Sequence, residues 1–489
     1  MSEEKPTQLE NQEDSGYETS PEKAEKEEFR KFVEEPGDND GENRNPTEHN
    51  TMLYTALLVM KGMIGEGILN LPLIIKTFGI FGGCIMTGFL VFIAISVASY
   101  LGKCKEITQR YSYAIYSKLM LGTTGTVIMK VSLIVMVSTM AVVQLIVFGD
   151  VLKGLSILIY DLNVKILIFG IALILLPFSF QKDISFIARI AYFGILGLGV
   201  FSICQIILFI MKYQQGKILF DNRMLYPKGS FKQIALCVGA YYNAFTFHMS
   251  YFGFYLPLKP RNNKTMMKSV TIGATATSII YYCYGVLIYL MYGDQITDSA
   301  LKYLQGDLAQ ANQAGDTFGV IILVACFLGY MVNASISSML NFYFFKSHFL
   351  GLIQFILKRK LEKEPAEEDK KDVPMIDIEE NKEDNDNKII KVKEEKEVKK
   401  LLTDRQEFWI TFGCYCYVLA MAIGFDKIII LDSFNGSTVA NYINIIAPCM
   451  FYLYFAKDKK NKCVDKTIAS FNVLFGCWLI IFYFILLFF

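Results

Sequence analysis

Charged residues are scarce in this sequence, and histidine is scarcer still. Asp, Glu, Lys and Arg make up 19% of the 489 residues, 48 basic residues nearly balance 47 acidic ones, and there are three histidines. Without a basic excess, the chain lacks the electrostatic signature of a nucleic-acid-binding protein. It also lacks an HExxH, P-loop, nucleophile-elbow or paired-acid motif. We therefore expect no nucleic-acid partner, no catalytic residues and no enzyme activity.

The eleven cysteines do not form a recognisable site either. Most lie inside apolar runs, and Cys414 and Cys416 are too close together to hold zinc on their own. This distribution is typical of small packing residues. We expect no disulfide framework, no metal site and no bound cofactor.

Apolar residues are what the sequence has in excess. They account for 53% of the chain, and the mean hydropathy is +0.35, which is more than a soluble surface tolerates. A membrane-spanning helix needs about 20 apolar residues. We therefore predict an all-α integral membrane protein with eleven transmembrane helices. The predicted spans are 51–76, 80–102, 127–149, 165–181, 188–211, 233–257, 269–293, 317–345, 406–426, 434–456 and 467–489.

Two segments outside these spans hold most of the charge. Residues 1–48 are rich in Glu, Asp, Asn and Pro, and residues 358–405 mix Lys with Glu, so neither buries enough apolar surface to fold alone. We expect a disordered cytosolic tail at 1–48, and a transmembrane domain at 49–489 that contains a flexible cytosolic loop at 358–405. Either segment is a candidate docking site for a cytosolic partner.

The Lys and Arg residues of the short connections predict the orientation, because they favour the cytosolic side. They concentrate in the connections after the second, fourth, sixth and tenth predicted spans, and the connection 212–232, with five basic residues, is the exception. No basic and apolar leader opens the sequence, so we expect the first membrane helix to direct insertion itself. This places the N-terminus in the cytosol and Phe489 on the opposite side.

The first predicted span has an unusual centre. The segment from Lys61 to Pro72 contains three glycines and the two ionisable residues Lys61 and Glu66. A glycine costs roughly 1 kcal/mol in a helix interior, and a charge at mid-membrane costs about 2.5 to 3.5 kcal/mol. Transporters tolerate such a composition where a broken helix lines a binding site. The alternative is that the glycines only permit close helix packing, which leaves both charges unexplained.

The sixth predicted span has a matching irregularity. Residues 239–248 place Asn243, Thr246 and His248 near its centre. The two irregular spans are five apart, which is the offset expected when two five-helix halves form an inverted repeat and each contributes one broken helix.

These segments resemble a known family. Residues 61–79, KGMIGEGILNLPLIIKTFG, resemble the first-helix signature of the amino acid/auxin permease family, especially that of its proton-coupled amino acid transporters. Residues 241–270 and 436–454 are more similar to the sodium-coupled neutral amino acid transporters. The resemblance extends over residues 50–489 apart from the charged loop. It implies eleven spans in a LeuT-like 5+5 inverted repeat with broken helices one and six.

The resemblance implies a secondary active transporter that moves small amino acids together with H⁺ or Na⁺ by alternating access. The exposed backbone amides from Gly62 to Gly67 would bind the substrate carboxylate, and carbonyls and side chains from Asn243 to Thr246 would face its amino group. The residues expected to bind substrate are Gly62, Met63, Ile64, Gly65, Glu66, Gly67, Asn243, Phe245 and Thr246.

The expected coupling residues lie on spans one, six and eight. Glu66 departs from the small or hydroxyl residue that the family has there. It is a candidate to carry a proton, ligate sodium or meet a cationic substrate, or to form a structural pair with Lys61 or a solvated cavity wall. His248 titrates near physiological pH or only hydrogen-bonds a neighbouring helix. Asn333, Ser335 and Ser337 offer oxygens that hard cations accept, and the family's sodium site lies between spans one and eight, although small hydroxyl residues also pack helices. Ser338 on the same span offers a further oxygen of this kind, and the weaker pocket candidates are Ser138, Gln144, Asn441 and Asn444.

A second function remains open on the same architecture. An amino acid sensor would use the same pocket to shift a conformational equilibrium and would signal without net flux. A channel would need repeated pore-lining polar residues, and the sequence has a single cluster. The sequence leaves open the identity of the amino acid, the choice of H⁺ or Na⁺, and the membrane, which is either the plasma membrane or that of a vacuole or lysosome.

Overall fold

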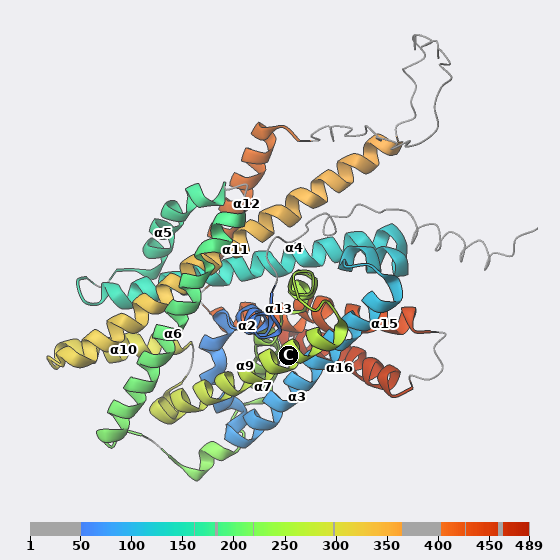
Figure 1. Cartoon of the computed structure of the whole chain (residues 1–489). Helices are drawn as coiled ribbons and strands as arrows, with labels where there is room; N and C mark the ends of the chain where they lie inside the picture. The colour runs from blue at the N-terminus through green and yellow to red at the C-terminus, as the bar shows by residue number, and fades with distance from the viewer. Residues whose placement is uncertain are drawn as a thin grey trace, which may run out of the picture.

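The chain folds into helices throughout the part that the computed structural model describes, residues 50–488 without 161, 181–183, 219, 297–298, 364–401, 426 and 458–462 (Figure 1). The first half comprises α2 (Met52–Met63), η1 (Glu66–Asn70), α3 (Leu71–Thr108), α4 (Tyr113–Ser156), α5 (Val164–Ser179), α6 (Ile184–Gln214), η2 (Asn222–Leu225), α7 (Phe231–Ala244), η3 (His248–Ser250) and α8 (Tyr251–Tyr255). The second half comprises α9 (Asn263–Tyr292), η4 (Gly293–Gln295), α10 (Ala300–Gln313), α11 (Thr317–Lys363), α12 (Asp404–Gly424), α13 (Ile428–Ser437), α14 (Val439–Asn441), the π-helical η5 (Tyr442–Ile446), α15 (Ala447–Phe455) and α16 (Cys463–Phe488).

Eight helical segments of the described residues are long and apolar enough to cross a membrane. They correspond to the second, third, fifth, seventh, eighth, ninth, tenth and eleventh spans predicted from the sequence. The other three predicted spans coincide with shorter helices. The first falls on α2, η1 and the start of α3, the fourth on the 16-residue α5, and the sixth on α7, η3 and α8. The protein is thus an all-helical, multi-pass membrane protein.

Two span boundaries differ from the sequence-based prediction. The predicted break at 77–79 is only a kink in α3, where Gly79 has φ 72° and a Cβ would lie 2.5 Å from the Tyr226 carbonyl oxygen. Only glycine fits a positive φ at so close an approach. The eighth span was predicted to end at 345, yet α11 continues to Lys363. Its 47 residues extend over roughly 70 Å, which exceeds the bilayer thickness. The continuation comprises a mixed segment with a second apolar stretch, residues 349–357, and then charged residues up to Lys363.

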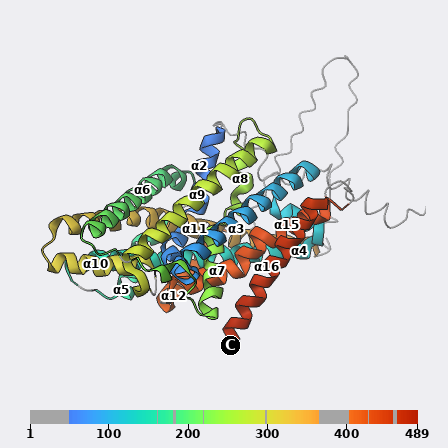
Figure 2. The same cartoon turned by 90° about the horizontal axis from the view of Figure 1, so that it is seen from below.

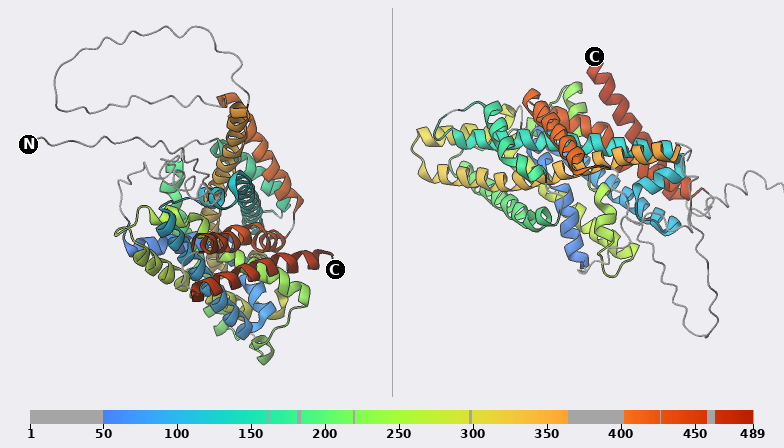
Figure 3. Two further views of the ribbon diagram at one scale, coloured as in Figure 1. Left: turned by 90° about the vertical axis from the view of Figure 1, so that its right-hand side faces the viewer. Right: turned by 90° about the horizontal axis from the view of Figure 1, so that it is seen from above.

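The helices pack in two groups (Figures 1 and 3). In one group α11 lies against α4 and α6, while α5 and α12 pack on α4 and on each other. In the other group α9 packs against α2 and α3, and α3 also contacts α7. α13 contacts both groups through α7 and α4. α16 packs on α15 and α7 at the edge of the molecule (Figure 2).

The predicted charged segments lie largely outside the described residues. This applies to the whole of the tail at 1–48 and to residues 364–401 of the loop at 358–405. The described ends of that loop are helical, since α11 reaches Lys363 and α12 begins at Asp404. Thr403 caps α12, because its hydroxyl accepts from the Gln406 N–H while the Gln406 side chain accepts from the Thr403 N–H.

Candidate functional site

The first interrupted helix lies between α2 and α3. α2 ends at Met63, Ile64 has an extended backbone with φ −77° and ψ 99°, and Gly65 also lies outside the helical region before η1 begins at Glu66. The Met63 carbonyl, which has left the helical pattern, accepts a 2.6 Å hydrogen bond from the buried Tyr281 hydroxyl of α9. A tertiary contact therefore satisfies a backbone group at the break, as the membrane environment requires.

The second interrupted helix meets the first. α7 ends at Ala244, where the Asn243 carbonyl accepts from both the backbone N–H of Thr246 and its hydroxyl, the latter at 2.8 Å. A Cβ on Gly67 would lie 2.8 Å from the Ala244 Cβ, so only glycine permits this approach. The two breaks are thus in direct contact. Phe245 and Thr246 are buried beside them.

Glu66 and Lys61 flank the first break without forming an ion pair. The Glu66 carboxylate is 4% exposed and accepts a hydrogen bond from the Gln144 side chain of α4. The Lys61 ammonium donates to Asn333 Oδ1 on α11 at 3.0 Å. The two charges attract each other electrostatically, but each has a different direct partner. The contacts therefore connect the interrupted helix, which carries both charges, to two helices of the other group.

Of the cation ligands predicted on α11, Asn333 faces the first break. Its oxygen is engaged by Lys61, as described above. Ser335 donates to the Met331 carbonyl of its own helix at 2.7 Å, and Ser337 is half-buried. No hydrogen bond of the described residues joins either serine to Asn333 or to α2. The structure thus brings one of the three to the first break.

His248 faces away from the charged groups of the first break. Its ring is fully buried, lies 2.9 Å from the Ala94 carbonyl oxygen of α3 through Nε2, and stacks on Phe247. Among the weaker candidates, Asn444 accepts from the Met249 N–H at 3.3 Å. These contacts hold η3 against α3 and η5.

Asp432 is the residue that sequence reasoning missed. It lies on α13, is 1% exposed, and accepts from Asn70 Nδ2 at 2.6 Å and from Asn243 Nδ2 at 3.2 Å. Asn435 Nδ2 in turn donates to Asn243 Oδ1 at 3.2 Å. Asp432 falls between the ninth and tenth spans predicted from the sequence, 406–426 and 434–456. The apolar run 428–431 immediately before Asp432 was the available signal that this carboxylate lies within the helical core.

Comparisons with known proteins agree with this architecture. A family model described as "Transmembrane amino acid transporter protein" matches residues 48–489. The protein "Amino acid transporter AVT6C" of Arabidopsis thaliana is 23% identical over 303 residues, which is 58% of this chain and 68% of the relative. The match to the family model includes both interrupted helices and their polar residues.

Proposed function

Because the chain belongs to the transmembrane amino acid transporter protein family, we propose that it is a secondary active transporter that moves small amino acids with H⁺ or Na⁺ by alternating access. The observation that carries this proposal is the direct contact of two interrupted helices beside the buried carboxylate of Glu66. Freed backbone groups and an ionisable side chain at one place suit a zwitterionic solute and a coupling cation. The Arabidopsis relative, whose name describes an amino acid transporter, supports the same substrate class.

The proposed architecture has eleven spans in a 5+5 inverted repeat. In it, the first span comprises α2 with η1, the sixth comprises α7 with α8, and α5 is the fourth. The two packed groups of helices suit a bundle that rocks against a scaffold. In this topology the N-terminus is cytosolic and the C-terminus extracytosolic, in the plasma membrane or the membrane of a vacuole or lysosome.

The proposed substrate site lies between the two breaks. Backbone amides from Gly62 to Gly67 would bind the carboxylate of the amino acid, because amides that start a helical segment are unpaired. The segment from Asn243 to Thr246 would face the amino group. A Cβ added at Gly65 would have no atom within 4 Å, so there is open space beside the break.

The coupling cation is proposed to bind near the two breaks, and the candidates named from the sequence are Glu66, His248, Asn333, Ser335 and Ser337. Glu66 is the strongest of them because it is ionisable, buried and located at the break. Asn333 acts through Lys61, whose ammonium already occupies its oxygen. Because the Lys61 ammonium occupies the Asn333 oxygen, that oxygen is not available to ligate sodium, which favours a proton as the coupling cation.

Uptake into proteoliposomes tests the proposal. The purified chain is reconstituted, and uptake of a panel of radiolabelled amino acids is measured while the pH and sodium gradients are varied independently. We expect concentrative uptake of at least one small amino acid with one of the two gradients. Saturable binding with no uptake and no exchange for any member of the panel would refute transport and indicate the sensor instead.

A further inference from the structure

Asp432 joins the two interrupted helices. Its carboxylate binds the side chain of Asn70, at the end of η1, and that of Asn243, in the last turn of α7. η1 follows the first break and α7 precedes the second. Any change in the hydrogen bonding of this one carboxylate therefore acts on both halves of the proposed substrate site.

The charge of this region is not balanced. Asp432 accepts only from amide groups, and no basic side chain of the described residues forms a salt bridge with it. Glu66 begins η1, the segment whose last residue, Asn70, binds Asp432, so two acidic side chains belong to this region while Lys61 supplies a single ammonium. A buried carboxylate without a counter-charge costs several kcal/mol. A zwitterionic substrate adds no net charge, so one further positive charge is needed.

The hydrogen-bonding groups around Asp432 suit a proton. Asn70 Oδ1 and Asn435 Oδ1 are buried and have no hydrogen-bond partner among the residues that the structure describes. A carboxylic acid must donate its proton to an acceptor, and an asparagine amide can present either nitrogen or oxygen after a half turn. Asn70 can therefore donate to the Asp432 carboxylate and, once turned, accept from its protonated form. A proton also needs no additional volume in a packed core.

We propose that Asp432 is the carboxylate that takes up the coupling proton, an inference that rests on the proposed transport function. The proton enters from the more acidic side and forms an O–H bond on Asp432 while substrate occupies the two breaks. The protonated acid donates to Asn70 Oδ1. The net charge of the buried centre formed by Lys61, Glu66 and Asp432 then rises from −1 to zero, and the loaded bundle reorients. The O–H bond breaks on the other side, where the proton leaves with the substrate.

The surroundings of Asp432 contain few other ionisable groups. Glu66 of η1 and the Tyr330 phenol of α11 interact with it electrostatically. α7, α4, α14 and α16, which pack against α13, contribute no other charged side chain that interacts with Asp432 within the described ranges. If the pH dependence of uptake is lost when Asp432 is replaced but retained when Glu66 is replaced, it is therefore assigned to Asp432.

Asp432→Asn tests this assignment in proteoliposomes, with the amino acid that gives the largest wild-type uptake. With one coupled proton, a gradient of one pH unit, acidic outside, drives about tenfold accumulation at equilibrium. We expect Asp432→Asn to reduce the accumulation ratio to about one. Exchange of labelled for unlabelled amino acid at equal pH should remain within about twofold of wild type, because exchange needs no net proton movement. Asp465→Asn, which removes a carboxylate that pairs with Lys103 at 2.7 Å outside this centre, should accumulate like wild type.

Four results would overturn the assignment. Two concern Asp432→Asn: it accumulates substrate like wild type, or it loses exchange although it unfolds at the wild-type temperature. Two concern the wild-type protein: a sodium gradient drives accumulation at constant pH, or uptake proceeds without proton movement. If Asp432→Asn does not fold, Asp432→Glu keeps a titratable group and should accumulate with a shifted pH midpoint, and an unshifted profile would refute the proposal. A wild-type protein without exchange of any amino acid would instead refute the transport function itself.

Discussion

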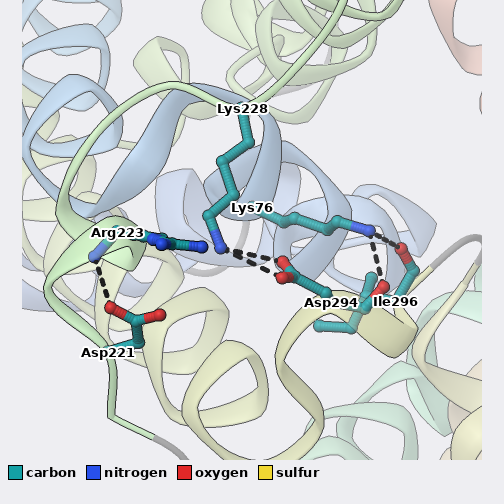
Figure 4. A network of polar contacts seen from close by, with 6 residues as sticks. All are labelled: Lys76, Asp221, Arg223, Lys228, Asp294 and Ile296. Atoms are coloured by element: carbon teal, nitrogen blue, oxygen red, sulfur yellow. Dashed lines mark hydrogen bonds and ion pairs between the residues drawn. The ribbon is translucent and has the colours of Figure 1, made fainter.

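Two groups of charged residues in this protein have opposite surroundings. In the first, Lys228 donates to both Asp294 oxygens at 3.0 and 3.1 Å, and Lys76 donates to the Asp294 and Ile296 carbonyls at 2.8 and 2.7 Å (Figure 4). The Asp294 side chain is 69% exposed. In the second, the carboxylates of Glu66 and Asp432 are buried and meet only amides.

The exposed charges around Asp294 join connections between helices, whereas the buried carboxylates of Glu66 and Asp432 are placed to interact with a ligand. The exposed group joins the start of α3 to the connections before α7 and after α9, and solvent screens its ion pair. The buried centre has no such screening, so its excess negative charge is costly and must be offset when the site is occupied. Substitutions in the buried centre should therefore alter transport, whereas those in the exposed group should alter stability slightly.

The largest effect is expected for Glu66→Gln. The amide that replaces the carboxylate can still accept from Gln144, so the fold is retained, while the negative charge that offsets Lys61 at the first break is lost. We expect cation-driven uptake to fall at least about tenfold, which corresponds to about 1.4 kcal/mol. Glu106→Gln, at an exposed position of α3, is the matched control and should take up substrate normally. If cation-driven uptake is equal in Glu66→Gln and Glu106→Gln, Glu66 has only a structural role.

Asn333→Leu should have the next largest effect, because it leaves the Lys61 ammonium without its 3.0 Å acceptor. A hydrogen bond to a charged group is worth about 1.5–3 kcal/mol, so we expect initial uptake rates to fall by about tenfold. Asn333→Asp retains an oxygen acceptor for Lys61 and should lose less. If the two variants behave alike, the oxygen at this position does not hold Lys61 in the working protein.

The sequence predicted one half of the buried centre and missed the other for a physical reason. Lys61 and Glu66 stand out because two charges and three glycines interrupt a single apolar run. Asp432 and its partners Asn70 and Asn243 are separated by 362 and 189 residues, and no local pattern shows such a contact. Asp432 also comes directly after the short apolar run 428–431, in a connection between two predicted spans, where a carboxylate ordinarily lies in solvent.

The lengths of the helices also depend on contacts that local sequence patterns do not show. Hydropathy located the apolar stretches that the long helices contain, since burial in lipid depends on composition. The continuation of α11 to Lys363 and the kink of α3 at Gly79 depend on backbone hydrogen bonding and on the approach of Tyr226. Composition does not encode either of these.

Tyr281→Phe removes a hydrogen bond at the first break, and Tyr282→Phe removes one from a regular part of α3, so the two variants compare the stability that each bond contributes. The Tyr281 hydroxyl donates to the Met63 carbonyl at the break at 2.6 Å, while its neighbour Tyr282 donates to the Ile80 carbonyl in α3 at 3.2 Å. Removing the buried bond leaves a carbonyl unsatisfied and should cost about 1–3 kcal/mol, whereas Tyr282→Phe should cost less. Thermal unfolding in detergent measures both. A larger fall in unfolding temperature for Tyr282→Phe would show that the Met63 carbonyl has another partner.

The smallest effect is expected for Asp294→Asn in the exposed group. Burial opposes the charge of Lys228, but its hydrogen bond with Asp294 and its interactions with Tyr289 and Asp294 outweigh this and raise the Lys228 pKa. The contribution of this pair is thus complete below the ordinary lysine pKa of about 10.4 and is lost as pH rises through the raised value. An exposed pair contributes about 1 kcal/mol or less, and Lys76 keeps its two carbonyl acceptors in the variant. We expect the unfolding temperature at neutral pH to fall slightly at low salt and to match wild type at about 1 M salt, where the screening length is about 3 Å. Loss of driven uptake in Asp294→Asn would break the distinction, because it would place a transport function in the exposed group.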